Sequence, residues 1–171
     1  MSHFRKNSSV KQVNYYFDTE DLKMNKKGIT CRIRYKNGTY KTTIKNHKNS
    51  IKDCSVETVV NTTSELVEDV FTSMGLKLQG NLVTNRTIVL HQNAFSIFLD
   101  KNDYLGHIDY ELEIEYMQSY DKHATQLIRD IASILISNGK LSSIEEFFAR
   151  MQNSKTKSQR FFERKLIVNK K

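Results

Sequence analysis

The chain has 171 residues, of which 38% are hydrophobic and 27% charged, and this composition is typical of one folded domain rather than a disordered chain. Its formal net charge of +8 favours anionic partners, although total charge does not distinguish nucleic acid, acidic lipid and phosphorylated small molecules. No apolar run approaches a membrane span, no signal peptide is visible, and the two cysteines have no zinc spacing, so we expect a cytoplasmic protein with no membrane partner.

Residues 1–11 read as the end of a helix and a loop that leads into a strand at Val13. Short alternating strands then occupy most of residues 13–99, with one helix among them at residues 64–74. Thr62 and Glu65 have the spacing of a capping box before this helix, and Gly75 suits its C-terminal end.

A further strand is predicted at residues 108–116, followed by a helix at residues 121–137 that ends at Asn138 and Gly139. Ser142 and Glu145 again have capping-box spacing and predict the start of another helix. The basic residues after Asn153 have no clear assignment. Because the chain has no proline, linker or repeat, we expect a single domain over residues 1–171.

The strongest local signal is a predicted hairpin at residues 31–45. Asn37 and Gly38 stand between two strand-like runs and favour a two-residue type I′ turn. The resulting register opposes Lys36 and Thr39, Arg34 and Lys41, Arg32 and Thr43, and Thr30 and Lys45. One face then carries Arg32, Arg34, Lys36, Lys41 and Lys45, while the other carries Cys31, Ile33, Tyr35, Tyr40 and Ile44. Neighbouring like charges require open water or an anion, so a solvated face and a phosphate site both remain open.

A row of carboxylates is predicted on the strand at residues 108–116. Apolar residues alternate strictly there with Asp109, Glu111, Glu113 and Glu115, which places the four carboxylates on one face. Asp100, at the end of a strand at residues 95–99, and Glu57, in a strand at residues 55–60, could join them. Hard divalent cations such as Mg²⁺ prefer carboxylate oxygen, but a solvated acidic face is the simpler interpretation of this strand alone.

The basic and acidic strands together are more informative than either strand by itself. In a closed or nearly closed antiparallel sheet, interior residues alternate with exterior ones, so a charged interior can coexist with an apolar outside. Arg86, in a strand at residues 82–90, would extend the cationic wall. We therefore predict an α+β domain, an antiparallel β-barrel or tunnel with flanking helices, that holds a polyphosphate and a divalent metal.

Segments in the same order and spacing resemble the CYTH superfamily, the triphosphate tunnel metalloenzymes, and especially its small bacterial branch. They are 15–19 (YYFDT), 31–34 (CRIR), 43–45 (TIK), Glu57, 84–86 (TNR), 99–100 (LD), 103–106 (DYLG), 110–113 (YELE) and 157–160 (KSQR). The resemblance implies an eight-stranded antiparallel tunnel that binds a triphosphate together with Mg²⁺ or Mn²⁺.

The resemblance also assigns roles to individual residues. Phosphate oxygens would be bound by Arg32, Arg34, Lys41, Lys45, Arg86, Lys157 and Arg160. Metal would be bound by Asp100, Glu111, Glu113 and Glu57, the last of which could instead position a basic neighbour. Glu111, Glu113 and Lys45 would serve in catalysis.

One departure from this family matters. Its N-terminal strand has the pattern Glu-x-Glu-x-Lys, whereas this chain has no acidic residue before Asp18. We therefore expect the first strand of the tunnel to be missing and metal-dependent turnover to be impaired. Met1 is interpreted as internal to a longer natural protein, with a shortened, degenerate protein as the alternative.

The resemblance implies a triphosphatase, a phosphoric anhydride hydrolase that acts on inorganic triphosphate or a similar small substrate. The alternatives are a non-catalytic polyphosphate- or nucleotide-binding protein, an adenylate cyclase-type enzyme and an RNA-binding basic domain. The sequence has no phosphate loop and no nucleophile elbow, so it gives no support to a P-loop enzyme or to a serine hydrolase. We expect no nucleic-acid partner, and a homodimer remains open.

Overall fold

The computed structural model describes residues 8–47, 56–92, 95–152 and 155–169. In chain order these residues form β1 (Ser9–Asp18), α1 (Lys23–Lys26), β2 (Ile29–Lys36), β3 (Thr39–Asn46), β4 (Val56–Thr63), α2 (Asp69–Thr72), β5 (Lys77–Gln92), β6 (Phe95–Tyr104), β7 (His107–Tyr116), the 3₁₀ turn η1 (Gln118–Tyr120), α3 (Asp121–Ser137), α4 (Ile144–Gln152) and α5 (Lys157–Val168).

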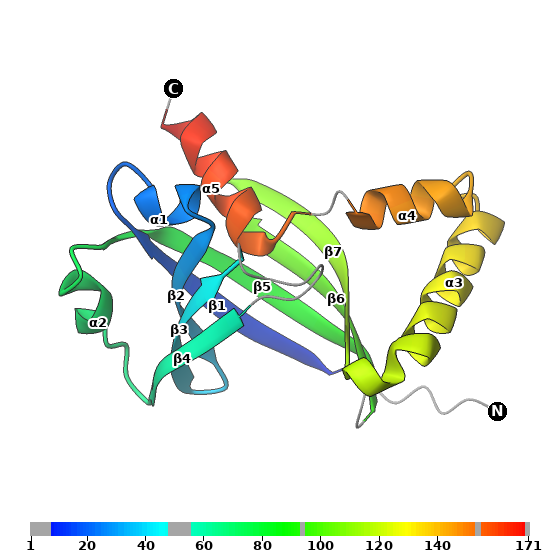
Figure 1. Cartoon of the computed structure of the whole chain (residues 1–171), viewed down its shortest axis with the longest axis horizontal. Helices are drawn as coiled ribbons and strands as arrows, with labels where there is room; N and C mark the ends of the chain where they lie inside the picture. Colours follow the sequence, from blue (N-terminus) through cyan, green and yellow to red (C-terminus); the bar gives the residue numbers. More distant parts are fainter. Residues whose placement is uncertain (1–7, 48–55, 93–94, 153–154, 170–171) are drawn as a thin grey trace.

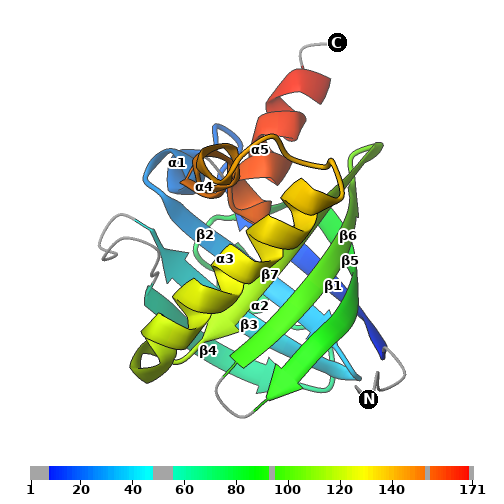
Figure 2. The ribbon, with the colours of Figure 1, turned by 90° about the vertical axis from the view of Figure 1, so that its right-hand side faces the viewer.

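The strands of the described residues form one seven-stranded antiparallel sheet in the order β4-β3-β2-β1-β5-β6-β7. β1 is therefore the central strand, and β4 and β7 are the edges, which do not pair with each other within the described part of the chain. The sheet is twisted and curved, with helices at its ends and sides (Figure 1; Figure 2). This arrangement confirms the predicted α+β class with flanking helices, as an open sheet.

The predicted hairpin is confirmed in every detail of its register. β2 and β3 oppose Lys36 and Thr39, Arg34 and Lys41, Arg32 and Thr43, and Thr30 and Lys45. Asn37 has φ 50° and Gly38 has φ 78°, the positive pair that a type I′ turn requires. Local sequence therefore determines which side chains of this hairpin share a face.

The two faces of the sheet have different chemistry. On one face, Phe17, Cys31 and Ile33 pack against Phe71 of α2 and Leu76 as a buried apolar cluster. The other face is polar although much of it is buried: Gln12, Asn14, Thr43, Thr84, Arg86, Asp100 and Asn102 all lie on it. We call this second surface the polar face, and it carries the charged residues discussed below.

The C-terminal helix α5 covers one end of the polar face, where Phe161 and Phe162 pack with Tyr16, Leu82 and Tyr104. The ring centroids of Tyr16 and Phe161 are 4.8 Å apart. A capping box between Thr156 and Gln159 fixes the first turn of α5. The start of α5 lies beside the strands (Figure 1), and from there Lys157 contacts Asp100 of β6 and Arg160 contacts Asp109 of β7.

The helices α3 and α4 pack against each other and against Ile114 of β7, with Ile128, Ala132 and Phe147 at the centre of their contact. The helix predicted at residues 121–137 is confirmed as α3. No helix of the described residues is both long and apolar enough to cross a membrane.

Several expectations about element ends were wrong, among them the ends of the strands predicted at residues 82–90 and 95–99, which are Lys77–Gln92 and Phe95–Tyr104. The helix predicted at residues 64–74 is only Asp69–Thr72, because Thr62 and Thr63 remain in β4 and pair with β3 instead of capping a helix. Leu66 and Met74, which lie inside the predicted helix but outside α2, are 38% and 52% exposed.

The start of α4 is displaced by one residue from its predicted cap, since the backbone N–H of Glu146 donates to Oγ of Ser143 and not of Ser142. Residues 9–11 belong to β1 and pair with β5, whose 16 residues offer backbone partners beyond the predicted strand. Residues 1–7, the rest of the predicted N-terminal helix end and loop, lie outside the described residues.

Candidate functional site

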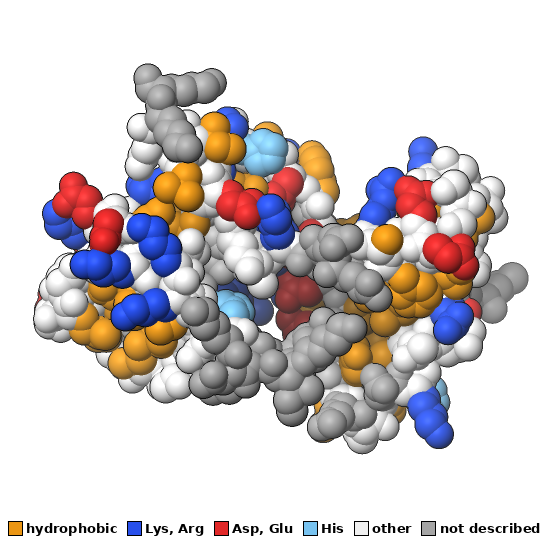
Figure 3. Space-filling model, turned by 45° about the horizontal axis from the view of Figure 1, so that its top comes forward, with side chains coloured by type: hydrophobic (Ala, Val, Ile, Leu, Met, Phe, Trp, Pro, Cys, Tyr) orange, Lys and Arg blue, Asp and Glu red, His pale blue; other side chains and the backbone are white. Residues whose placement is uncertain are grey.

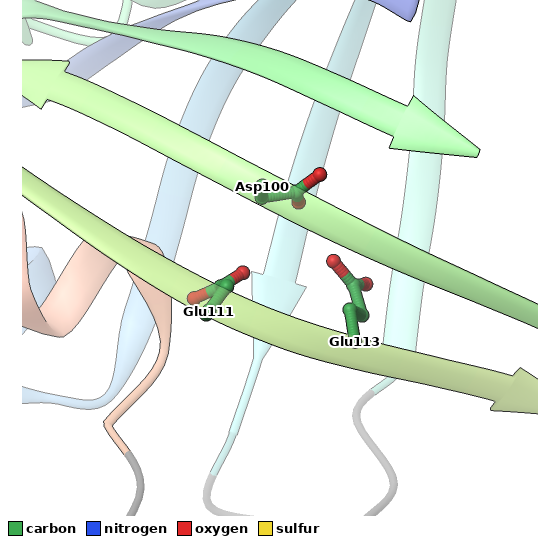
Figure 4. A group of neighbouring side chains, drawn as sticks. All are labelled: Asp100, Glu111 and Glu113. Carbon is green, nitrogen blue, oxygen red and sulfur yellow. The ribbon is translucent and has the colours of Figure 1, made fainter. Parts of the chain in front are cut away.

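Three carboxylates meet on the polar face where β6 and β7 pair. The register opposes Asp100 and Glu111, and Glu113 follows on the same face of β7. Each offers an oxygen that lies within 4.8 Å of the other two, and Figure 4 shows the three side chains pointing into a shared space. Asp100 is only 1% exposed. We call these residues the acidic cluster; oxygen donors of this kind suit a hard divalent cation.

The ammonium group of Lys157 contacts all three members of the acidic cluster. Its Nζ lies 2.9 Å from Oδ2 of Asp100 and 3.0 Å from Oε2 of Glu113, and it also pairs with Glu111. The cluster fits a divalent cation by its donors and their convergence, and Lys157 holds a positive charge at the same place.

Two arginines also contact the carboxylates. Arg86 makes a two-pronged contact with Asp100, at 2.9 and 2.8 Å, and pairs with Glu113. Arg160 pairs with Glu111 and lies 2.9 Å from Asp109. Burial by itself would raise the pKa of Glu113, but the charges of Lys157 and Arg86 outweigh it and lower that pKa to about 2.

A second charged group lies on the other half of the sheet, around Glu57 of β4. Its carboxylate is 2.6 Å from Nζ of Lys45, 3.2 Å from Arg32 and 3.3 Å from Lys41. Partial burial would raise the pKa of Glu57, but the hydrogen bond from Lys45 and the charge of Arg32 lower it to about 2. With Arg34 on the same face, these cations form what we call the basic wall, and they exceed its single carboxylate in charge.

Arg34 differs from the other cations of the basic wall. Within the described residues no carboxylate pairs with it, and its Nε donates to Oδ1 of Asn14 at 2.7 Å. Burial, followed by the charge of neighbouring Arg32, lowers the pKa of Arg34 to about 10. Its guanidinium is thus charged at neutral pH but poorly solvated.

The basic wall on β2–β4 and the acidic cluster on β6 and β7 are separated by β1 and β5. Figure 3 looks into a hollow where acidic and basic side chains lie side by side at depth. An anion that bound the basic wall could therefore reach the acidic cluster through a bridging cation.

Most of the predicted site residues lie on the polar face, but some of them have different neighbours from those predicted. Asp100, Glu111 and Glu113 are brought together, whereas Glu57, also predicted as a metal ligand, faces the basic wall instead. Arg32, Arg34, Lys41 and Lys45 lie on the basic wall. Arg86, Lys157 and Arg160, predicted to bind phosphate, contact the carboxylates.

The sequence analysis missed the neutral polar residues between the two groups. Asn102 accepts from Thr84 and donates to Asp109, and Tyr104 donates to Asp109 at 2.6 Å. Asn14, on the central strand, was also missed. The alternation of Gln12 and Asn14 with Val13 and Tyr15 was the available signal, since it places both amides on the polar face.

Comparison with known protein families identifies the family to which this chain belongs. The family model of the CYTH domain matches residues 2–147. The chain belongs to the CYTH family. Members of this family act on triphosphate substrates, and an acidic cluster that could hold a metal ion is present here. Comparison with curated protein sequences finds no match.

Solved structures share the fold of this CYTH domain. A proposed adenylate cyclase from Bacillus halodurans is 25% identical, with a TM-score of 0.58 over 90% of this chain and 83% of that one. A proposed adenylyl cyclase from Hippeastrum, described as having a dominant triphosphatase activity, is 15% identical, with a TM-score of 0.53 over 78% of this chain and 84% of that one. A Pyrococcus horikoshii protein is 20% identical, with a TM-score of 0.51 over 86% and 89% of the two chains.

Proposed function

We propose that this CYTH domain binds a small triphosphate and hydrolyses it with Mg²⁺ or Mn²⁺, with inorganic triphosphate as the leading substrate. The observation that carries the proposal is the division of one polar face into a basic wall and an acidic cluster. The excess cations of the wall need an anion, and the convergent carboxylates suit a divalent metal. A metal-bound polyphosphate supplies both charges in one ligand.

The residues of the basic wall would bind the phosphate oxygens. Arg32, Arg34 and Lys41 would neutralise and orient the substrate, and Lys45 would stabilise the negative charge that develops on the leaving diphosphate. Arg86, Lys157 and Arg160 pair with carboxylates in this structure and would turn toward phosphate oxygens when substrate is bound.

Asp100, Glu111 and Glu113 would hold the metal, which when bound polarises a phosphoryl oxygen and neutralises developing charge. Glu111 and Glu113 would also orient water toward the terminal phosphorus and accept its proton. The oxygen of that water bonds to phosphorus as the phosphoanhydride P–O bond breaks. Inorganic triphosphate and water thus yield diphosphate and orthophosphate.

We propose that turnover is impaired in this chain. The acidic cluster contains three carboxylates, and each of them already contacts a cation of the chain within the described residues. A metal must compete with that cation, so occupancy at a given metal concentration is reduced.

The same observation favours a second candidate, a non-catalytic polyphosphate- or nucleotide-binding protein. If Lys157 stays in the acidic cluster, the basic wall can still bind phosphates while no metal is held. An adenylate cyclase-type activity would use the same residues, so only the products separate it from hydrolysis.

The test is to incubate the protein with inorganic triphosphate, ATP or thiamine triphosphate and Mg²⁺ or Mn²⁺, and to measure orthophosphate, diphosphate and cyclic AMP. We expect slow release of orthophosphate that Glu111→Gln abolishes. Glu163→Gln is the matched control, because Glu163 lies on α5 and pairs with Lys155 at 2.8 Å, away from the cluster. Tight binding without any product would instead establish the non-catalytic candidate.

A further inference from the structure

One buried polar atom on the polar face has no hydrogen-bond partner among the residues that the structure describes. Asn14 is 0% exposed, and its side-chain Nδ2 makes no hydrogen bond within the described residues. A buried donor that leaves water without finding an acceptor destabilises a protein, and such groups are rare in native structures. This atom therefore points to an acceptor that binds there.

The orientation of the Asn14 amide is fixed by its neighbour. Nε of Arg34 donates to Oδ1 of Asn14 at 2.7 Å. A guanidinium has donors and no acceptor, so exchanging the amide oxygen and nitrogen would place two donors face to face. The oxygen must face Arg34, and the two N–H bonds of Nδ2 remain directed elsewhere.

The comparison with Asn102 shows that the missing partner is specific to Asn14. Both amides are fully buried on the polar face. Asn102 accepts from Thr84 at 2.7 Å and donates to Asp109 at 2.9 Å, so both ends of its amide are used. Within the same described residues, the side chain of Asn14 uses only its oxygen.

The place of Asn14 indicates which acceptor it would meet. It lies on β1, the central strand, opposite Arg34 of β2 and Leu82 of β5, and so between the basic wall and the strands of the acidic cluster. Its neighbour Arg34 is a poorly solvated cation with no carboxylate partner in the described part of the chain. Among the described residues, a cation that pairs with no carboxylate and a donor that has no acceptor stand side by side, and an anionic oxygen satisfies both.

We propose that Asn14 is a substrate-binding residue that, together with Arg34, donates a hydrogen bond to an oxygen of the bound polyphosphate at the boundary between the two charged groups. The inference rests on the proposed function, because it names a ligand for the same substrate. A neutral donor adds a contact there without adding another positive charge to the crowded basic wall.

Two substitutions distinguish the role of Nδ2 of Asn14 as a hydrogen-bond donor from the role of its Oδ1, which accepts a hydrogen bond from Arg34. Asn14→Asp keeps an oxygen acceptor beside Arg34 and removes the donor, so the protein should remain at least as thermally stable as wild type. Asn14→Ala removes the donor without adding charge. Gln12→Glu is the matched control, because Gln12 lies two residues away on the same strand and face and the change adds the same charge as Asn14→Asp.

Binding of inorganic tripolyphosphate would be measured by isothermal titration calorimetry, with and without Mg²⁺, beside the melting temperature of each protein. A hydrogen bond to a charged oxygen predicts about tenfold weaker binding for Asn14→Ala. Asn14→Asp should weaken binding more than Gln12→Glu by a similar factor, without a lower melting temperature.

The outcomes are distinguishable. If wild type binds tripolyphosphate and both Asn14 variants bind it as tightly as the Gln12→Glu control, the inference fails and the proposed function stands. If Asn14→Ala does not fold, the affinities of Asn14→Asp and Gln12→Glu for tripolyphosphate are compared instead, and equal affinities would refute the inference. If wild type binds no tripolyphosphate under either condition, the proposed function fails and the inference with it.

Discussion

Replacing Lys157 by methionine should tighten the binding of Mn²⁺ or Mg²⁺ in the absence of phosphate. The Lys157 ammonium lies 2.9 Å from Asp100 and 3.0 Å from Glu113, on the side of α5 that faces the acidic cluster. Methionine keeps most of the length of the side chain and removes its charge. A divalent cation would then enter the cluster without first displacing an ammonium.

The magnitude follows from the burial of these charges. At an effective dielectric constant of about 20, an ion pair at this distance has a Coulomb energy of about 5 kcal/mol, most of which is offset by desolvation of the partly buried ammonium. If Lys157→Met removes a net stabilisation of about 2 kcal/mol from the metal-free protein, metal binding becomes roughly 30-fold tighter. The metal-free variant should accordingly unfold more easily, and added metal should restore its stability.

The assay is isothermal titration calorimetry with MnCl₂, supported by electron paramagnetic resonance of free Mn²⁺. Lys165→Met is the control, because it removes the same charge from the same helix at a residue whose Nζ donates to the backbone oxygen of Gln79. Unchanged or weaker Mn²⁺ binding by Lys157→Met would show that Lys157 does not compete with metal.

Two further perturbations test the charge pairing and the packing of the fold. Glu57→Gln should lower the free energy of unfolding near pH 7 by about 2 kcal/mol, since Lys45 and its neighbours lower the pKa of Glu57 from 4.5 to about 2. A lowered carboxylate pKa stabilises the protein above pH 4.5, so in urea titrations the difference from wild type should shrink between pH 4.5 and 2; a constant difference contradicts this assignment. Phe161→Ala should cost about 3–5 kcal/mol in the same measurement, because Phe161 is 0% exposed, whereas Leu166→Ala, at an exposed position on the same helix, should cost under about 1 kcal/mol. Equal losses for these two variants would mean that α5 does not anchor the fold.

The elements that the sequence predicted well are those whose pattern is local. The β2–β3 register follows from a turn in which Asn37 and Gly38 adopt positive φ, and α3 follows from a regular apolar stripe and the stop at Asn138 and Gly139. The helix at residues 64–74 failed because pairing with β3 extends β4 through Thr63. A cross-strand partner far along the chain outweighed a local capping pattern.

The site shows the same contrast between what a local pattern predicts and what depends on residues distant in the chain. Strict alternation along β7 placed Glu111 and Glu113 on one face, and alternation along β2 placed Arg32 with Arg34. Alternation does not say which charges will meet across the sheet. Arg86 was expected to extend the basic wall, and it instead contacts Asp100, its partner in the β5–β6 register.

The amino-acid sequence by itself therefore determined the family, the basic strands, the acidic strand and the side chains that share a face of each strand, because a strand repeats every two residues whatever surrounds it. Only the tertiary structure decided that Glu57 faces cations, that α5 brings Lys157 to the acidic cluster, and that Asn14 is buried with no partner for Nδ2 in the described part of the chain. Those contacts join residues distant in the chain, and they depend on the curvature of the sheet and on the docking of one helix across it.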